Sequence, residues 1–176
     1  DLECNSERIR AFPNMNYVSD AVFMISYISQ RAHDHSTRKK TLLVVGDCKP
    51  IEGAEIRYFK HEIEAIDGLI DIIMEDDPTI LMGYNTARFD NPYMDARMKI
   101  YFRDWKSCSL IKDVQGGIDT ISWQSGAYGH VTISSLKAEG RLNIDMFPII
   151  KRDHKLELYN LDFVSNKFLG RGKHPV

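Results

Sequence analysis

Three carboxylates stand at spacings that could bring them together in one site. Asp1 and Glu3 are two residues apart in a short stretch of strand character, and side chains two apart on a strand share a face. Asp90 follows the apolar run Thr79–Gly83 and joins them if that run forms a nearby strand. Converging carboxylates repel one another unless cations hold them, and hard oxygen ligands suit Mg²⁺ or Mn²⁺. The chemistry that this arrangement predicts is two-metal hydrolysis of a phosphodiester.

The first half of the chain is predicted to be a meander of strands that positions the first two carboxylates. Residues 5 to 17 are predicted to be a loop, and Ala21–Ile28 and Thr41–Val45 are apolar, β-rich runs of strand length. Between them, Gln30–Lys40 is polar and charged, which favours a surface connection. With the N-terminal strand these runs would form an antiparallel meander, and Glu55–Phe59 is a shorter strand candidate.

Helical periodicity begins after this meander. Apolar residues repeat at helical spacing over His61–Glu75, and Asp76–Pro78 ends that helix. The strand Thr79–Gly83 follows, and Asn91 and Pro92 are predicted as the cap and a first-turn residue of a second helix. The buried stripe of this second helix is predicted to comprise Met94, Met98, Tyr101 and Trp105.

The last third contains a hairpin and two further helical segments. Thr120–Ser125 and His130–Ser134 alternate around the turn Gly126–Gly129, which is typical of a β-hairpin. Arg141–Asp145 is predicted as a short strand and Met146–Lys151 as a helical turn, in which Pro148 argues against a long helix. A final helix is predicted with Asn160 as its cap, Leu161, Val164 and Phe168 facing inward, and Gly170 as its end.

The element order predicts the fold class, and the composition limits the alternatives. Strand, helix, strand, helix after a meander is the order of a ribonuclease-H-like α/β sheet, which places Asp90 at the carboxyl end of a strand. The 23 Lys and Arg nearly balance the 25 Asp and Glu, so any phosphate-binding surface is local. No apolar run is long enough to span a bilayer. The three cysteines are odd in number and widely spaced, which favours reduced thiols in an intracellular setting.

The motifs, taken in order, resemble those of a known family. Asp1–Cys4 resembles the first exonuclease motif of family B DNA polymerases, and Tyr84–Tyr93 resembles the second. Gly140, Arg141 and Asp145, followed by Ile150–Leu156 and Tyr159–Gly170, resemble the next segment of the delta-type eukaryotic and large-DNA-virus enzymes. The resemblance covers nearly the whole chain, and the order of these blocks makes it specific.

The resemblance implies a 3′–5′ proofreading exonuclease domain with a ribonuclease-H-like fold, a mixed sheet flanked by helices with a β-hairpin insertion. Residues 1 to 176 would be one domain, C-terminally incomplete, of a longer replicative polymerase. Asp1, Glu3 and Asp90 would bind two Mg²⁺ ions, or Mn²⁺. The single-stranded 3′ end would be held by Asn85 through hydrogen bonds and by Phe89 through packing, with Tyr84 beside them.

The resemblance also implies partners and a site of action. DNA is the implied partner, and a sliding clamp and accessory subunits could join it. The site of action is intracellular: the nucleus for a cellular enzyme, the host nucleus or a cytoplasmic factory for a viral one.

One departure from the family pattern bears on activity. The family's third motif, Tyr-x-x-x-Asp, supplies a fourth carboxylate and normally lies beyond the Leu169–Gly170 segment. This chain has no such pattern, and Asp145 or Asp153 would substitute only if the fold brought them in. The isolated segment is therefore expected to be weak or inactive, whereas the parent polypeptide is expected to be an active polymerase with an exonuclease domain.

Other interpretations of these residues remain open. The chain could be an inactivated exonuclease-like module that binds single-stranded DNA or scaffolds a replisome, or an unrelated α/β binding domain with a solvated acidic surface. Phe89 could be a core residue, and Asp90 a helix cap. His33-Asp34-His35 lacks a third metal ligand, and Arg38-Lys39-Lys40 is most simply a solvated loop end that could touch a phosphate.

Overall fold

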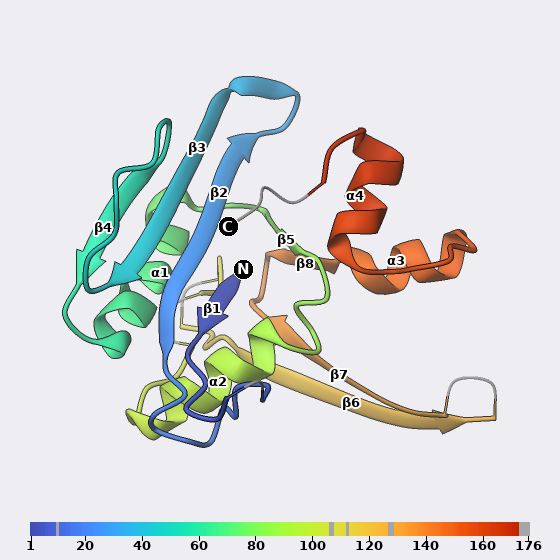
Figure 1. The fold of residues 1–176 in the computed structure, drawn as a ribbon, viewed down its shortest axis with the longest axis horizontal. Coiled ribbons are helices and arrows are strands. Elements are labelled where there is room, and N and C mark those ends of the chain that lie inside the picture. Colours follow the sequence, from blue (N-terminus) through green and yellow to red (C-terminus); the bar gives the residue numbers. More distant parts are fainter. Residues whose placement is uncertain (10, 106–107, 112, 127–128, 173–176) are drawn as a thin grey trace.

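The computed structural model describes residues 1–9, 11–105, 108–111, 113–126 and 129–172 as an α/β arrangement of strands and helices (Figure 1). The strands are β1 (Leu2–Cys4), β2 (Val22–Arg31), β3 (Asp34–Val45), β4 (Glu55–Phe59), β5 (Ile80–Gly83), β6 (Gly117–Ser125), β7 (Gly129–Lys137) and β8 (Leu142–Asp145). The helices are α1 (Glu62–Asp76), α2 (Asp90–Ile100), α3 (Met146–Asp153) and α4 (Leu161–Leu169). A mixed α/β fold is thereby confirmed.

The largest sheet has the strand order β1-β2-β3-β4. The pairs β1/β2 and β2/β3 are antiparallel, so the predicted meander is confirmed, whereas β4 lies parallel to β3. Inward-facing residues of the inner strands, Val22, Ile25 and Leu43 among them, are almost completely buried. This burial fixes the register, because a slip by one residue would turn these side chains to the opposite face.

The segment Gln30–Lys40 lies at the surface, as predicted, but the prediction that all of it is a connection is wrong. β2 continues to Arg31 and β3 begins at Asp34, with Ile28 opposite Lys40 and Ser29 opposite Lys39. His33, in the turn, adopts a left-handed backbone with φ of 62°. The two strands extend beyond the core as a solvent-exposed ribbon, so polar side chains on both faces carry no burial penalty and the usual alternation is missing.

Helix α1 packs against the four-stranded sheet and confirms the predicted helix to within one residue at each end. A Cβ on Gly68 would lie 2.6 Å from Phe59 and 3.1 Å from Leu43, which shows how closely the helix approaches the sheet. The helix ends at Asp77, which adopts a left-handed conformation and donates its backbone N–H to Ile73. Pro78 cannot continue the helix, as expected for a residue just past the C-cap.

Helix α2 begins earlier in the chain than the predicted cap. Phe89 is the N-cap and Asp90 the first helical residue, while Pro92 lies in the first turn as expected. Asn91 is therefore not the cap, and its side-chain amide instead donates to the Ser134 carbonyl of β7 at 3.0 Å. In the predicted stripe, Met94, Met98 and Trp105 are buried and Tyr101 is half-buried, although Tyr101 and Trp105 lie beyond the last helical turn.

The remaining strands form two separate pairs. β5 pairs in parallel with β8, and β6 pairs with β7 in the predicted hairpin, whose turn at residues 127–128 lies outside the described residues. Neither pair is hydrogen-bonded to the four-stranded sheet in the described part of the chain. At the outer edge of β1, the amide of Leu2 is taken by a side chain of α2 rather than by another strand. The four-stranded sheet is therefore mixed, as predicted, but among the described residues it does not include β5, β6, β7 or β8.

Helices α3 and α4 lie together on one side of the molecule, apart from α1 (Figure 1). Asn160 caps α4 by accepting from the amide of Phe163 at 2.8 Å, and Gly170 ends it with φ of 67°, as predicted. Val164 is buried, but Leu161 and Phe168 are 38% and 44% exposed, so only part of the predicted inward face is covered. No helix in the described ranges is long and apolar enough to cross a membrane, and none of the three cysteines is in a disulfide.

Candidate active site

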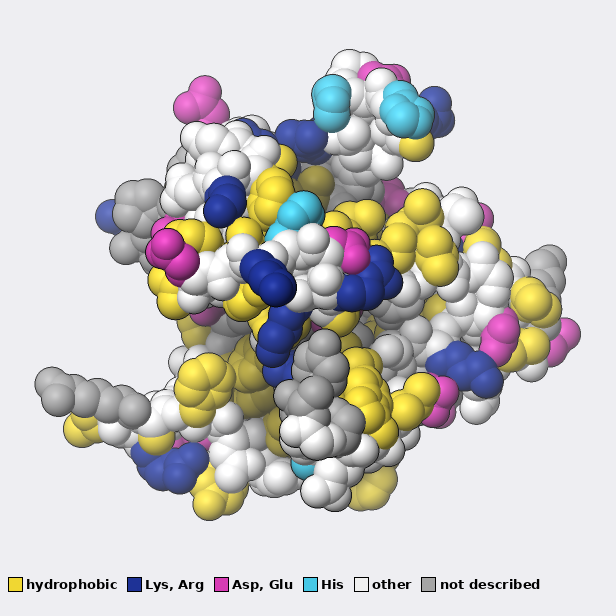
Figure 2. Space-filling model, turned by 90° about the vertical axis from the view of Figure 1, so that its right-hand side faces the viewer, with side chains coloured by type: hydrophobic (Ala, Val, Ile, Leu, Met, Phe, Trp, Pro, Cys, Tyr) yellow, Lys and Arg dark blue, Asp and Glu magenta, His cyan; other side chains and the backbone are white. Residues whose placement is uncertain are grey.

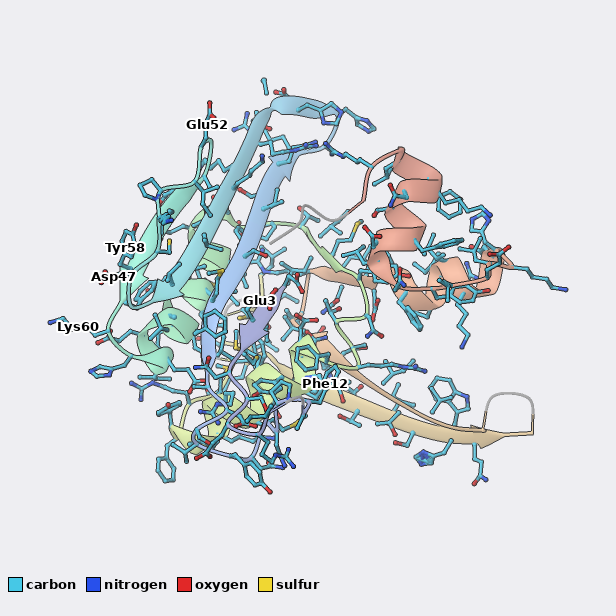
Figure 3. The ribbon with its side chains drawn as sticks, viewed as in Figure 1. Glu3, Phe12, Asp47, Glu52, Tyr58 and Lys60 are labelled. Atoms are coloured by element: carbon cyan, nitrogen blue, oxygen red, sulfur yellow. The ribbon has the colours of Figure 1, made fainter. Side chains whose placement is uncertain are left out.

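The first and second acidic motifs meet at the edge of β1. The backbone N–H of Leu2 donates to Oδ1 of Asp90 at 3.1 Å. Leu2 is the residue between Asp1 and Glu3. The Asp90 carboxylate therefore contacts the strand next to both of these acidic residues. Leu2 is buried while Asp1 and Glu3 are exposed, as expected when alternate side chains point to opposite faces. In Figure 3, Glu3 projects from β1 near the middle of the molecule.

Asp90 is half-buried at the first turn of α2, and this environment shifts its titration. Burial raises the pKa of the Asp90 carboxyl above the usual range, and the negative charge of Asp145 raises it further. The hydrogen bond from the Leu2 amide opposes this shift without cancelling it. A carboxylate with a raised pKa is one that a bound cation would stabilise, because the cation favours the ionised form.

Asp145, at the end of β8, is brought next to this site by the β5–β8 pairing. Its Oδ1 accepts the backbone N–H of Asn85 at 2.7 Å, and its Oδ2 accepts that of Ala87 at 3.0 Å. Oδ1 also accepts the N–H of Phe147 at 2.9 Å and so caps α3. Asp145 therefore holds the backbone of the second motif in place through these hydrogen bonds.

We expect Asp145→Ala to destabilise the fold by about 2–3 kcal/mol, because one helix cap and two further backbone donors lose their acceptor. This corresponds to a fall of roughly 4–12 °C in the melting temperature. Asp153→Ala is the matched control, since Asp153 is exposed and pairs with the adjacent Arg152. Thermal unfolding of the two variants checks the prediction, and equal melting temperatures would contradict it.

The predicted DNA-contacting residues Asn85 and Tyr84 lie in the loop that Asp145 holds. Asn85 has a left-handed backbone with φ of 62°, and its side-chain Oδ1 is buried without a hydrogen-bond donor among the described residues. The Tyr84 hydroxyl donates to the Tyr159 carbonyl at 2.6 Å, so its donor is already used within the protein. The proposed contacts of both residues with DNA stay predictions.

Phe89 lies between the site and the core. Its ring meets Phe12 edge-on at 5.9 Å and Tyr93 at 5.3 Å, and it packs against the hydrophobic core while remaining half-buried. Phe12 is 80% exposed and projects beside α2 in Figure 3. Phe89 thus has the packing of a core residue, and its contact with a nucleotide stays a prediction.

The carboxylates do not converge into one compact group. Within the described ranges, no three Asp, Glu, His or Cys side chains are close enough together to hold one metal ion, and this includes His33-Asp34-His35. The donor type nevertheless fits: Asp1, Glu3 and Asp90 offer only hard oxygen atoms, which suit Mg²⁺ or Mn²⁺.

The structure also gathers residues that the sequence patterns did not single out. Arg88, Phe147, Lys151 and Tyr159 form a cluster of cations and aromatic rings next to Asp145. One feature of the sequence could have indicated this cluster: Phe147 and Lys151 are four residues apart, which puts both on one face of a helix. Asp153, in contrast, is exposed and paired with Arg152 at 2.6 Å, so it does not join the site.

An α/β domain in which the second acidic motif meets the strand of the first, at the edge of β1 and the start of α2, is compatible with an exonuclease domain. Comparison with known families agrees, because the exonuclease domain of DNA polymerase family B matches residues 1–164. The chain belongs to this family. The resemblance seen in the motifs is thereby confirmed.

Several polymerases are similar to the whole chain. It is 34% identical to DNA polymerase 120R of Invertebrate iridescent virus 3, 34% identical to the putative DNA polymerase 060R of Frog virus 3 (isolate Goorha), and 30% identical to the DNA polymerase delta catalytic subunit of Candida albicans. Each similarity covers 100% of this chain but only 16%, 18% and 17% of the respective relative. The chain thus spans about a sixth of the length of these proteins.

Proposed function

We propose that this chain is the proofreading 3′–5′ exonuclease domain of a family B replicative DNA polymerase, with a ribonuclease-H-like fold. Its substrate would be the 3′-terminal phosphodiester of single-stranded DNA. The observation that carries the proposal is the hydrogen bond from the Leu2 amide to Asp90 Oδ1, which joins the second acidic motif to the strand of the first. Membership of the exonuclease-domain family supports the same reaction.

In this proposal, Asp1, Glu3 and Asp90 bind two Mg²⁺ or Mn²⁺ ions. Bound divalent ions supply a hydroxide nucleophile near neutral pH and stabilise the departing 3′ oxygen. Asn85 orients the terminal nucleotide through its side-chain amide, and Phe89 and Tyr84 pack beside it. A base contact through an aromatic ring tolerates any sequence, as removal of an arbitrary mispaired nucleotide requires.

The partner of the whole polypeptide would be primer-template DNA, with a sliding clamp and accessory subunits as further partners. Proofreading would take place inside the cell, in the compartment where the DNA is replicated. An inactive module that only binds single-stranded DNA is the second candidate, and the observation in its favour is that no three acidic side chains in the described residues form a compact group.

The test is 3′-end trimming of a 5′-labelled single-stranded oligonucleotide with Mg²⁺, with Mn²⁺, or with EDTA. The 176-residue chain is compared with the longer polypeptide that contains it. We expect the longer polypeptide to shorten the oligonucleotide one nucleotide at a time with either metal, and the chain alone to be weak or inert. If the longer polypeptide binds the oligonucleotide without ever shortening it, the inactive-module function is correct instead.

A further inference from the structure

A cluster of two cations and two aromatic rings lies beside the proposed active site. The guanidinium carbon of Arg88 lies 5.4 Å from the ring centre of Phe147. The ammonium of Lys151 lies 6.0 Å from the ring centres of both Phe147 and Tyr159. The two rings pack edge to face at 6.5 Å, and Tyr84 meets Phe147 edge-on at 5.7 Å. The half-buried rings therefore form a support that holds two exposed positive charges.

These two cations differ from their neighbours in what balances their charge. In the described part of the chain, neither Arg88 nor Lys151 has a carboxylate within 4 Å, whereas Arg152 pairs with Asp153 at 2.6 Å and Lys99 pairs with Asp95 at 2.6 Å. An aromatic ring attracts a cation through its quadrupole but carries no net charge. Arg88 and Lys151 are thus held in position with their positive charge left available to an anion.

The cluster is connected directly to the carboxylates. Arg88 is two residues before Asp90, and Phe147 is two residues after Asp145, which accepts the amide of Phe147. In Figure 2, Lys and Arg side chains gather in the middle of the face on which α3 and α4 lie. A strand whose 3′ end lies at Asp90 would have its preceding phosphates within reach of this surface.

We propose that Arg88 and Lys151 bind backbone phosphates of single-stranded DNA on the 5′ side of the terminal nucleotide. Phe147 and Tyr159 act as the support that fixes the two cations. The phosphates carry no sequence information, which suits a strand of any sequence. This inference rests on the proposed exonuclease function, because it takes the 3′ end to lie at Asp90.

The experiment measures binding of a fluorescein-labelled oligothymidylate to the 176-residue chain by anisotropy. EDTA is present, so that hydrolysis does not contribute. The variant is Arg88→Gln/Lys151→Gln, and the matched control is Lys99→Gln/Arg152→Gln, which removes the same charge from two ion-paired residues. Far-ultraviolet circular dichroism and melting temperatures verify that both variants are folded.

The affinity for single-stranded DNA falls as the salt concentration rises. In Arg88→Gln/Lys151→Gln, the loss of two phosphate contacts is expected to make the slope of log affinity against log salt concentration less steep by about 1.4. The ratio of wild-type to variant affinity is therefore expected to shrink roughly sevenfold between about 50 and about 200 mM salt. The control is expected to keep the wild-type slope.

Three results would overturn the inference: an unchanged slope in Arg88→Gln/Lys151→Gln, an equal change in the control, or no binding by the wild-type chain at the lower salt. Failure of the exonuclease function has a different signature. In that case the salt slope of the variant still changes, while the longer polypeptide shows no metal-dependent trimming.

Discussion

In the longer polypeptide, Asp90→Asn is expected to lower the rate of 3′-end trimming about a thousandfold, which corresponds to roughly 4 kcal/mol of lost transition-state stabilisation. The side-chain amide oxygen introduced by this substitution can still accept the hydrogen bond that the Leu2 amide makes with Asp90 at 3.1 Å. The fold is therefore kept while the negative charge is lost. Single-turnover trimming of a 5′-labelled oligonucleotide with Mg²⁺ measures the change.

Asp71→Asn is the matched control, because Asp71 is exposed on α1 and the same charge is removed. Its trimming rate is expected to equal that of the wild type.

The raised pKa of Asp90 adds a second readout. Near the pH at which this carboxyl is partly protonated, Mg²⁺ binding must displace its proton. Calorimetry in buffers of different ionisation enthalpy measures the number of protons released when Mg²⁺ binds. This number is expected to be smaller for Asp90→Asn than for the wild type. Full activity of this variant would rule out Asp90 as a ligand.

Arg97→Met is expected to lower the free energy of unfolding by about 3–5 kcal/mol, because it leaves a buried carboxylate without its partner. Arg97 and Glu62 are 0% and 5% exposed, and their charged groups lie 2.6 Å apart. Arg97 also donates to the Tyr17 and Val18 carbonyls, while Glu62 accepts the Val22 amide at 2.7 Å. The network thereby joins α1, α2, β2 and the preceding loop.

For a chain of this size, the expected loss corresponds to a fall of roughly 6–20 °C in melting temperature. Arg57→Met is the control, since Arg57 forms a more exposed pair with Glu55 and is expected to change stability by about 0–1 kcal/mol. The double variant Glu62→Leu/Arg97→Met is expected to lose less than the sum of the two single variants, because neither charge remains unpaired. Equal effects of Arg97→Met and Arg57→Met on urea unfolding would contradict the prediction.

Local patterns predicted most elements of the fold. The bounds of β4 agree with the predicted Glu55–Phe59, and α1 agrees to within one residue at each end. The caps of α4 at Asn160 and Gly170 were also predicted correctly. These features depend on neighbours three or four residues away, on backbone sterics and on local hydrogen bonds. Such short-range causes are present in the sequence itself.

Features that depend on a distant partner were not predicted. Asn91 was expected to be a cap, but its side chain bonds to β7, 43 residues further along the chain. The helical periodicity did not predict that Arg97 is buried, because its ion-pair partner Glu62 lies on another helix. The ribbon of β2 and β3 has polar side chains on both faces, so no alternation indicated a strand. In each case the deciding interaction joins segments that are remote in sequence.

The same division applies to the candidate site. The sequence by itself determined which residues carry the carboxylates and which family the motifs belong to, because residue type and short spacing are sufficient for both. Only the tertiary structure placed Asp90 against the Leu2 amide and the second-motif loop on Asp145. The tertiary structure also placed the Arg88 guanidinium over the ring of Phe147. These contacts require the close approach of β1, α2 and β8, which the packing of the folded chain decides and no local pattern encodes.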